Sequence, residues 1–445
     1  MPALPASLPT ALLPAHGVGS RQDLPLPFAA VVLGAAAALI VSFVALGALW
    51  HEPRLGPDSG IPLPRWAAAV LDSRVVRGTA VVLTLALTVW TLASLVLGRD
   101  DANSPVPYVV YVWLWVGLAA ISLVLGPVWS ALNPIRWLHR GLTALARLDP
   151  DTALTDRSPG YWPAALGLFA FTWLELVAPD RTTLPVLRVA IGAYVLANLL
   201  GALVLGTRWF PRGDAFEVWS RLYGSLSPLG RRSDRRWVLR TPLHGANAIP
   251  LERGLLATVA VMLGGTAYDG LSSEPRWYTW VQSSSLPSGL PQTGGLLLMC
   301  VVVAGLLQVA ALASAQLARV PARGLAGQFA PSLVPIAAGY LVAHYWSLWV
   351  YEGQNTLVRL SDPLGTGADL LGTGHLTADA TLIQPALVAT IQVLAIVTGH
   401  VLGVVLAHER AVTLFDRRVA VLGQLPLLVL MVAYTCGGLY LLFSS

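Results

Sequence analysis

Lysine is absent from the sequence, and all 28 basic residues are arginine. A P-loop needs a lysine to hold the phosphates of a nucleotide, and a Schiff-base enzyme needs a lysine amine as its nucleophile. The composition therefore excludes P-loop nucleotide hydrolysis and lysine-based covalent catalysis in this chain.

Charged residues of either sign are also scarce. They make up 11% of the 445 residues, while hydrophobic residues make up 55% and the mean hydropathy is +0.66. A typical soluble domain contains about 25% charged residues, which cover its surface. The composition therefore predicts an integral membrane protein.

Cysteines and the common catalytic motifs are few or missing. The two cysteines, Cys300 and Cys436, each lie inside an apolar run, and no CxxC pair is present. A disulfide framework is therefore not expected. The sequence also lacks a GxSxG nucleophile elbow, a GxGxxG fingerprint and an HExxH zinc motif, and an EF-hand loop. Any metal site must be assembled from residues on different helices.

Ten long apolar segments are present. A spanning helix requires roughly 20 mostly apolar residues, and the segments that approach or meet this length are 27–50, 78–98, 106–128, 161–178, 184–206, 255–271, 294–318, 327–350, 383–406 and 420–443. They predict an all-α bundle of about ten transmembrane helices. The bundle forms one polytopic domain over 27–443, preceded by an outer N-terminal segment of residues 1–26.

Arginine is distributed unevenly between the two sides that these spans define. The connections after spans one, three, five, seven and nine contain 22 arginines, nine of them in the loop 207–254, whereas the opposite side contains five. Because arginine-rich connections remain in the cytoplasm, we expect a multi-pass protein of the inner (cytoplasmic) membrane with both termini outside. The net charge of +5 reflects this sidedness, so the expected partners are the lipid bilayer and a small molecule, not nucleic acid.

Three stretches on the arginine-rich side combine arginine with leucine and tryptophan, namely 64–73, 132–148 and 213–229. This pattern is typical of amphipathic helices that lie in the membrane interface. We therefore expect three interfacial helices on the cytoplasmic side.

The N-terminal segment resembles a leader peptide only weakly, because it lacks a charged start. Cleavage after Ala15 would leave His16 as the mature terminus, where its amine and imidazole could together chelate copper. Leu13 at the −3 position disfavours cleavage there. His16 is a candidate metal ligand on this basis.

Ionisable side chains inside spans are costly in a bilayer, and each is a candidate for function. Glu175 and Arg188 lie on either side of a tight outer turn. We expect them to form an ion pair.

A second group of ionisable residues shares the outer side. Asp269, His344 and Glu352 are of types that bind zinc or copper or act as a base, and we expect them to form a catalytic cluster, with Asp269 and His344 as metal ligands. His344 and Glu352 are eight residues apart, or roughly 12 Å along a helix, so they cannot ligate the same ion. His400 lies deeper, where it is either a further metal ligand or an interhelical hydrogen-bonding group.

Several short strings resemble a known family, the bacterial polytopic membrane proteins named fenitrothion hydrolases. The strings are His16-Gly17, Arg21-Gln22-Asp23-Leu24-Pro25, Leu132-Asn133-Pro134-Ile135-Arg136, Asp269-Gly270-Leu271, Ala343-His344-Tyr345, Thr398-Gly399-His400 and Ala407-His408-Glu409-Arg410-Ala411. The resemblance implies hydrolysis of an organophosphate ester at the membrane. Asp269, His344 and Glu352 would then supply ligands or a base.

Two functional hypotheses follow. The first is a membrane-embedded hydrolase acting on phosphoric triesters, assisted by a divalent metal such as zinc or copper. The second is a transporter or metal-handling permease, with a polar path from His344 through Gln392 to His400 and His408. Convergence of the outer groups around one site favours the hydrolase, and a continuous polar track favours transport.

Overall fold

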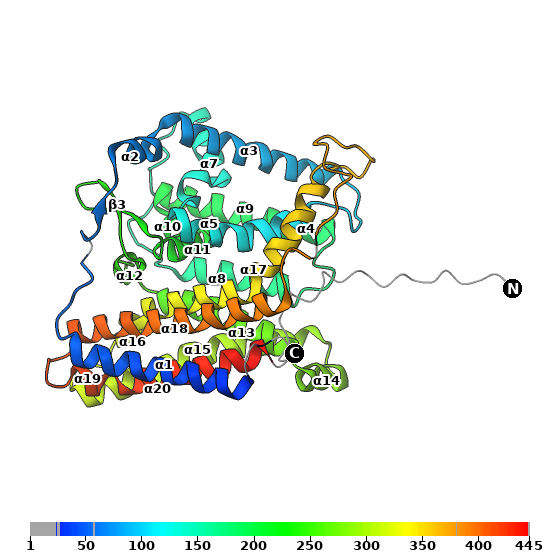
Figure 1. Cartoon of the computed structure of the whole chain (residues 1–445). Coiled ribbons are helices and arrows are strands. Elements are labelled where there is room, and N and C mark those ends of the chain that lie inside the picture. The colour runs from blue at the N-terminus through cyan, green and yellow to red at the C-terminus, as the bar shows by residue number, and fades with distance from the viewer. Residues whose placement is uncertain (1–23, 25–26, 57, 380, 444–445) are drawn as a thin grey trace.

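The computed structural model describes residues 24, 27–56, 58–379 and 381–443 (Figure 1). Within these residues, nine helical segments are long and apolar enough to cross a membrane. They are α1 (Phe28–Leu49), α3 (Arg74–Leu97), α4 to α5 (Val106–Leu125), α9 with η3 (Leu184–Arg208), α13 (Leu255–Ser272), α15 (Gly289–Ala318), α16 to α17 (Leu325–Arg359), α18 (Pro385–Leu414) and α19 to α20 (Ala420–Leu442). The chain is therefore an all-α multi-pass membrane protein, as predicted.

The predicted fourth span is shorter than the others. It forms α8 (Trp162–Leu176), whose 15 residues extend roughly 22 Å at 1.5 Å per residue. This length falls short of the roughly 30 Å hydrocarbon core of a bilayer. α8 packs against α13 and against α11 (Ala215–Gly224). It is therefore part of the helix bundle although it is too short to span the bilayer alone.

Three of the spans are interrupted by other helix types or subdivided. The third span comprises α4 (Val106–Tyr108), the π-helix η2 (Val109–Gly117) and α5 (Leu118–Leu125). The eighth comprises α16 (Leu325–Phe329), the 3-10 turn η4 (Ala330–Leu333) and α17 (Val334–Arg359), and the tenth comprises α19 (Ala420–Gly423) and α20 (Leu425–Leu442). The turn η3 (Gly206–Arg208) ends the span of α9.

The connections contain short elements. The helices are α2 (Arg65–Asp72), α6 (Trp129–Leu132), α7 (Pro134–Leu145), α10 (Phe210–Gly213), α12 (Pro242–Asn247) and α14 (Pro275–Ser283). The strands β1 (Ile61–Pro62), β2 (Leu229–Arg231) and β3 (Trp237–Leu239) form an antiparallel sheet in the order β1-β3-β2, with Val238 opposite both Pro62 and Gly230.

The two ends of the bundle differ. Figure 1 shows α2, α12, α19 and the small sheet at one end, and α14 at the other. We call the first the arginine-rich end, because it contains the connections 50–73, 126–161, 207–254, 319–324 and 415–419, and the second the opposite end.

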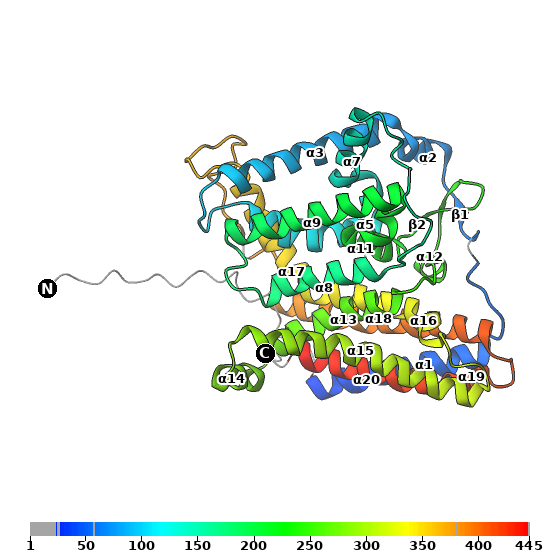
Figure 2. The same ribbon diagram turned by 180° about the vertical axis from the view of Figure 1, so that it is seen from behind.

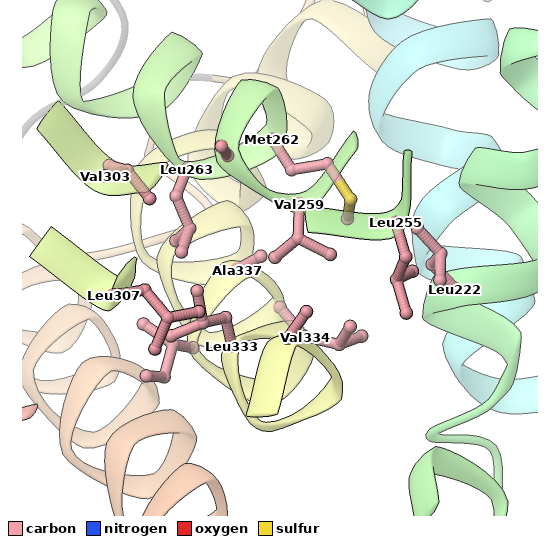
Figure 3. Close-up of a cluster of buried hydrophobic side chains, with 14 of the residues drawn as sticks. Leu222, Leu255, Val259, Met262, Leu263, Val303, Leu307, Leu333, Val334 and Ala337 are labelled. Atoms are coloured by element: carbon pink, nitrogen blue, oxygen red, sulfur yellow. The ribbon is translucent and has the colours of Figure 1, made fainter. Parts of the chain in front are cut away.

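The bundle has a buried centre. Figures 1 and 2 both show α3 and α9 on one side of the molecule, α1, α15 and α20 on the other, and α13, α17 and α18 between them. The apolar windows of α13 and of the α16 to α17 span are 72% and 78% buried, against 17% for α3. In Figure 3, Val259 and Leu263 of α13 meet Leu307 of α15 and Leu333 and Ala337 of the eighth span in the core.

Small residues allow the central helices to approach closely. A Cβ added at Gly399 of α18 would lie 2.6 Å from the Pro335 carbonyl oxygen, and one at Gly339 of α17 would lie 2.4 Å from the Ala395 carbonyl oxygen. Because neither distance can accommodate a methyl group, glycine at both positions determines the α17–α18 spacing.

The expected interfacial helices divide into two kinds. α2 buries no residue and α7 buries only Ile135 and His139, as the prediction requires. In α11, by contrast, every residue except Arg221 is buried. The expectation that 213–229 lies on the membrane surface is therefore wrong.

The reason lies in the start of α11, which pairs with the start of α7. Asn133 caps α7 and Asp214 caps α11, and the Asn133 amide Nδ2 donates to Asp214 Oδ2 at 2.8 Å. Three residues after each cap, Arg136 donates to both carboxylate oxygens of Glu217, at 2.7 and 2.9 Å. The polar residues that make this segment amphipathic thus bind other parts of the protein, not water.

Candidate functional site

The two most buried spans bring an acid and a histidine together. Asp269 lies in the last turn of α13 and His344 in the middle of α17, and His344 Nε2 lies 2.7 Å from Asp269 Oδ2. Each residue is 3% exposed. With Asp269 ionised, the Nε2–H group donates to the carboxylate, which fixes the orientation and the tautomer of the imidazole.

Aromatic side chains hold this pair in place. The Tyr345 hydroxyl donates to the same oxygen, Asp269 Oδ2, at 3.1 Å. The His344 ring packs edge-on against Tyr345, with centroids 4.7 Å apart, and is stacked with Tyr340 at 6.1 Å. The imidazole therefore lies between two tyrosine rings of its own helix.

A second acid lies nearby. Glu175, in the last turn of α8, is 7% exposed and close enough to Asp269 for their charges to interact. Its Oε2 atom has no hydrogen-bond partner among the described residues. The interior of the opposite end thus contains two carboxyl groups. Asp269 is hydrogen-bonded to a histidine, and Glu175 is not.

Glu175 does not form the expected ion pair with Arg188. The Arg188 guanidinium Nε donates to the Leu95 carbonyl oxygen at 2.7 Å, at the end of α3. The last carbonyls of a helix have no partner within that helix, and Arg188 supplies one. The ion-pair prediction is therefore wrong.

Glu352 lies two helical turns beyond His344 on α17, apart from the Asp269–His344 pair. It is buried, and its Oε2 accepts a hydrogen bond from Asn355 Nδ2 at 2.9 Å. The prediction that Glu352 joins Asp269 and His344 in one cluster is therefore wrong. The eight-residue separation of His344 and Glu352 along α17 keeps their side chains apart.

His400 is buried in α18, where its Nδ1–H donates to the Ile396 carbonyl oxygen at 2.8 Å. Its Nε2 has no partner within the part of the chain that the structure describes. The predicted ligand His16 lies outside the described residues.

The donor set for a metal is incomplete among the described residues. Within them, no three His, Cys, Asp or Glu side chains come close enough to bind one ion, whereas catalytic zinc usually has three protein ligands. Asp269 and His344 are also bonded to each other. The arrangement is therefore that of a histidine oriented by a carboxylate, and it lacks the third ligand of a metal centre among the described residues.

The third span packs against α17, the helix that carries His344, through a feature that the sequence did not indicate. Its π-helical segment η2 includes Trp115, which stacks on Trp219 of α11 with centroids 3.8 Å apart and planes 16° apart. Trp115 and Tyr345 belong to the same buried cluster. π-helical turns often occur at functional sites, but a uniformly apolar stretch such as 109–117 gives no signal for one.

At the arginine-rich end, His408 and Glu409 hold the chain after α1. His408 Nε2 and Nδ1 lie 2.7 Å from the Trp50 carbonyl oxygen and 3.0 Å from Gln424 Oε1. Glu409 accepts hydrogen bonds from the backbone N–H groups of Arg54 and Leu55 and from Trp50 Nε1. These contacts give both residues a structural role.

The fold and the site define a polytopic α-helical membrane protein with an acid–histidine pair in its interior. Comparisons add no closer identification: no family model, curated protein or solved structure matches the chain.

Proposed function

We propose that the protein is a membrane-embedded hydrolase in which the Asp269–His344 pair acts as the base. The observation that carries this proposal is the 2.7 Å bond between two side chains that are each 3% exposed. A histidine whose tautomer is fixed by a buried carboxylate is the arrangement that enzymes use to take a proton from a nucleophile.

The chemistry proceeds with the residues present. While Asp269 accepts from Nε2–H, the lone pair of His344 lies on Nδ1, where it takes a proton from an attacking water molecule. The water oxygen forms the new bond to phosphorus and the alkoxide or phenoxide group departs. Glu175, near Asp269, is the group that we assign to protonating this leaving group.

The substrate class that we propose is a neutral phosphoric triester. The resemblance to fenitrothion hydrolases suggests it, and such an ester carries no charge that would keep it out of the bilayer. The buried, aromatic-walled surroundings of His344 suit a ligand that enters from lipid. Under the arginine distribution, the opposite end faces the outside of the inner membrane, and this orientation is part of the proposal.

Turnover of a chromogenic aryl phosphotriester by purified protein in proteoliposomes tests the proposal. We expect Asp269→Asn and His344→Gln to lower kcat/KM by at least about 100-fold, the usual contribution of a positioned base. His400→Gln, an equally buried histidine on the adjacent helix, is the matched control and should retain turnover. No triester hydrolysis by the unmodified protein, or unchanged rates in both site variants, would refute the assignment.

Metal content, measured on the same samples, tests the role of zinc or copper. Stoichiometric metal that is lost in both site variants would identify Asp269 and His344 as ligands, with the remaining ligand sought at His16. Metal retained in both variants would show that the pair does not bind it.

Transport is the second candidate, and the interior polar atoms of α18 favour it. Both amide atoms of Gln392 and Nε2 of His400 lack partners among the described residues, although buried polar atoms without partners cost about 1–3 kcal/mol each. Solute or water passing along α18 would supply partners. The same proteoliposomes, loaded with a pH- or zinc-sensitive dye, would then show flux that Gln392→Leu abolishes, whereas a hydrolase would show none.

A further inference from the structure

An open groove runs along the outside of the bundle at the arginine-rich end. It has a volume of about 490 Å³, and it lies between the last turns of α9 and the segment 155–159. Its apolar wall consists of Leu200, Gly201, Val204, Leu205 and Trp209. Because the first four of these residues lie in the last turns of a spanning helix and Trp209 follows it directly, the groove opens to the lipid of one leaflet.

The groove is built by specific contacts between these two segments. The Leu154 N–H donates to the Val204 carbonyl oxygen at 2.8 Å, and the Thr207 N–H donates to the Pro150 carbonyl oxygen at 3.1 Å. These bonds hold the connection 149–159 against the end of α9. The groove is therefore a defined feature of the fold.

Its floor depends on a glycine. A Cβ added at Gly201 would lie 2.2 Å from Cε2 of the Trp209 ring, so only glycine lets the indole lie against α9. The indole N–H of Trp209 donates to Asn198 Oδ1 at 2.9 Å, which fixes the ring. The result is a rigid apolar floor.

The rim of the groove is polar and includes one arginine. Arg157 is the one charged residue of the lining, and Thr155 and Ser158 add hydroxyl groups beside it. Arg208 lies nearby, and its ion-pair partner Asp156 is 3.5 Å away and 99% exposed, so this pair is weak. An arginine and two hydroxyl groups above an apolar trough complement a phosphate joined to an acyl chain.

We propose that this groove binds an anionic glycerophospholipid from the leaflet at the arginine-rich end. One acyl chain lies against Leu200, Val204 and Trp209, and the phosphate contacts Arg157. Arg140 of α7, which packs against α9, and Arg147, which follows that helix, are exposed at the same end and strengthen the attraction for anionic headgroups. This site is separate from the Asp269–His344 pair and does not depend on the function proposed for it.

Native mass spectrometry of the detergent-purified full chain, titrated with phosphatidylglycerol or phosphatidylcholine, tests the site. We expect one phosphatidylglycerol to remain bound preferentially. Arg157→Gln should weaken its binding about fivefold, the value of one arginine near an anionic membrane surface, and should weaken phosphatidylcholine binding less, because choline already neutralises the charge of that phosphate. Arg65→Gln, an exposed arginine on α2 at the same end, is the matched charge control and should behave like the unmodified protein.

A second pair of variants tests the apolar trough. Val204→Trp fills the groove and should abolish the retained lipid, whereas Leu203→Trp, at a neighbouring exposed position outside the lining, should not. Equal retention of both lipids would overturn the proposal, as would unchanged binding in Arg157→Gln and Val204→Trp. Competition by millimolar glycerol phosphate alone would also overturn it, because it would identify a soluble phosphate as the ligand.

Discussion

At the scale of single residues, the polar side chains of the interior act in pairs. Asn133 and Asp214 cap two different helices and bond to each other, and Arg136 and Glu217 repeat the pairing one turn further on. Each partner satisfies the other where water is excluded, and an unpaired buried charge would cost several kcal/mol. The connection between α7 and α11 is thus specified by side chains, not by apolar contact alone.

Asp214 should make stability depend on pH. Burial raises the pKa of Asp214 to about 6 from its ordinary 3.8, against hydrogen bonds from Tyr194 and the Glu217 N–H. Because the folded state then binds the proton more tightly than the unfolded chain, stability should fall as pH rises from about 4 to about 6. The pKa difference corresponds to about 3 kcal/mol.

Unfolding in mixed micelles at several pH values would measure this effect. The unmodified protein should lose about 2 kcal/mol more than Asp214→Asn between about pH 4 and pH 6, and the rest of the roughly 3 kcal/mol outside that interval. Asp156→Asn, at a 99% exposed position, should follow the unmodified protein. Identical slopes for all three proteins would show that Asp214 does not titrate in this range.

At the scale of elements, glycine sets how closely the central helices approach. Gly339 and Gly399 place the backbones of α17 and α18 in contact, and α17 also carries His344. A larger residue at this contact would push α17 away from α18 and toward α13, where Asp269 lies. Packing outside the site therefore fixes the geometry within it.

Gly399→Ala should destabilise the protein by about 1–3 kcal/mol, the usual cost of overpacking, because its Cβ would lie 2.6 Å from the Pro335 carbonyl oxygen. Gly305→Ala in α15 is the matched control, since nothing lies within 4 Å of that Cβ, and helix propensity should stabilise it by up to about 1 kcal/mol. Thermal unfolding in detergent would compare them. Equal midpoints would contradict the role of Gly399.

The sequence predicts the elements well and their pairing less well. Hydropathy locates all ten apolar helices, because each must satisfy its backbone internally and cover that backbone with apolar side chains. The pattern of 213–229 could not distinguish a surface helix from α11, since Asp214 and Glu217 look the same whether water or Asn133 and Arg136 bind them. The tight turn between the two spans likewise predicts Glu175 as the partner of Arg188, whereas the actual partner is a backbone carbonyl of α3, which carries no sequence signal.

The candidate site was predictable only in part for the same reason. Asp269 and His344 stand out in the sequence because ionisable residues in spans are rare, and the structure places them in contact. Glu352 lies toward the same end of the bundle as Asp269 and His344, but it is not in contact with them. The depth of a residue in a span, which the sequence gives, does not show the direction in which its side chain points. Tyr345 is adjacent to His344 in the sequence, yet its hydrogen bond to Asp269 depends on how α13 and α17 pack.

At the scale of the whole molecule, the charge distribution matches the architecture. The arginine-rich connections gather with the small sheet at one end, and α14 lies at the other (Figure 2). An insertion machinery that retains arginine-rich connections in the cytoplasm would orient the bundle with the Asp269–His344 pair toward the outside.

Cysteine labelling tests this orientation. In a chain in which Cys300 and Cys436 are replaced by alanine, Ser285→Cys reports the opposite end and Ser233→Cys the hairpin between β2 and β3, both at exposed positions. In right-side-out vesicles, a membrane-impermeant maleimide should label the first and not the second. Inverted vesicles should give the reverse, and the contrary pattern would invert the topology.

The packing of α1 has a consequence for how the chain is made. α1 packs chiefly against α18 and α20, and the residues that follow it are bound by Glu409. The helix α1 therefore has its main partners far along the chain, and these partners are made well after it. During synthesis α1 must remain in the bilayer without these partners until α18 and α20 are inserted. A chain that stops before α18 would leave α1 unpacked and exposed to quality-control proteases.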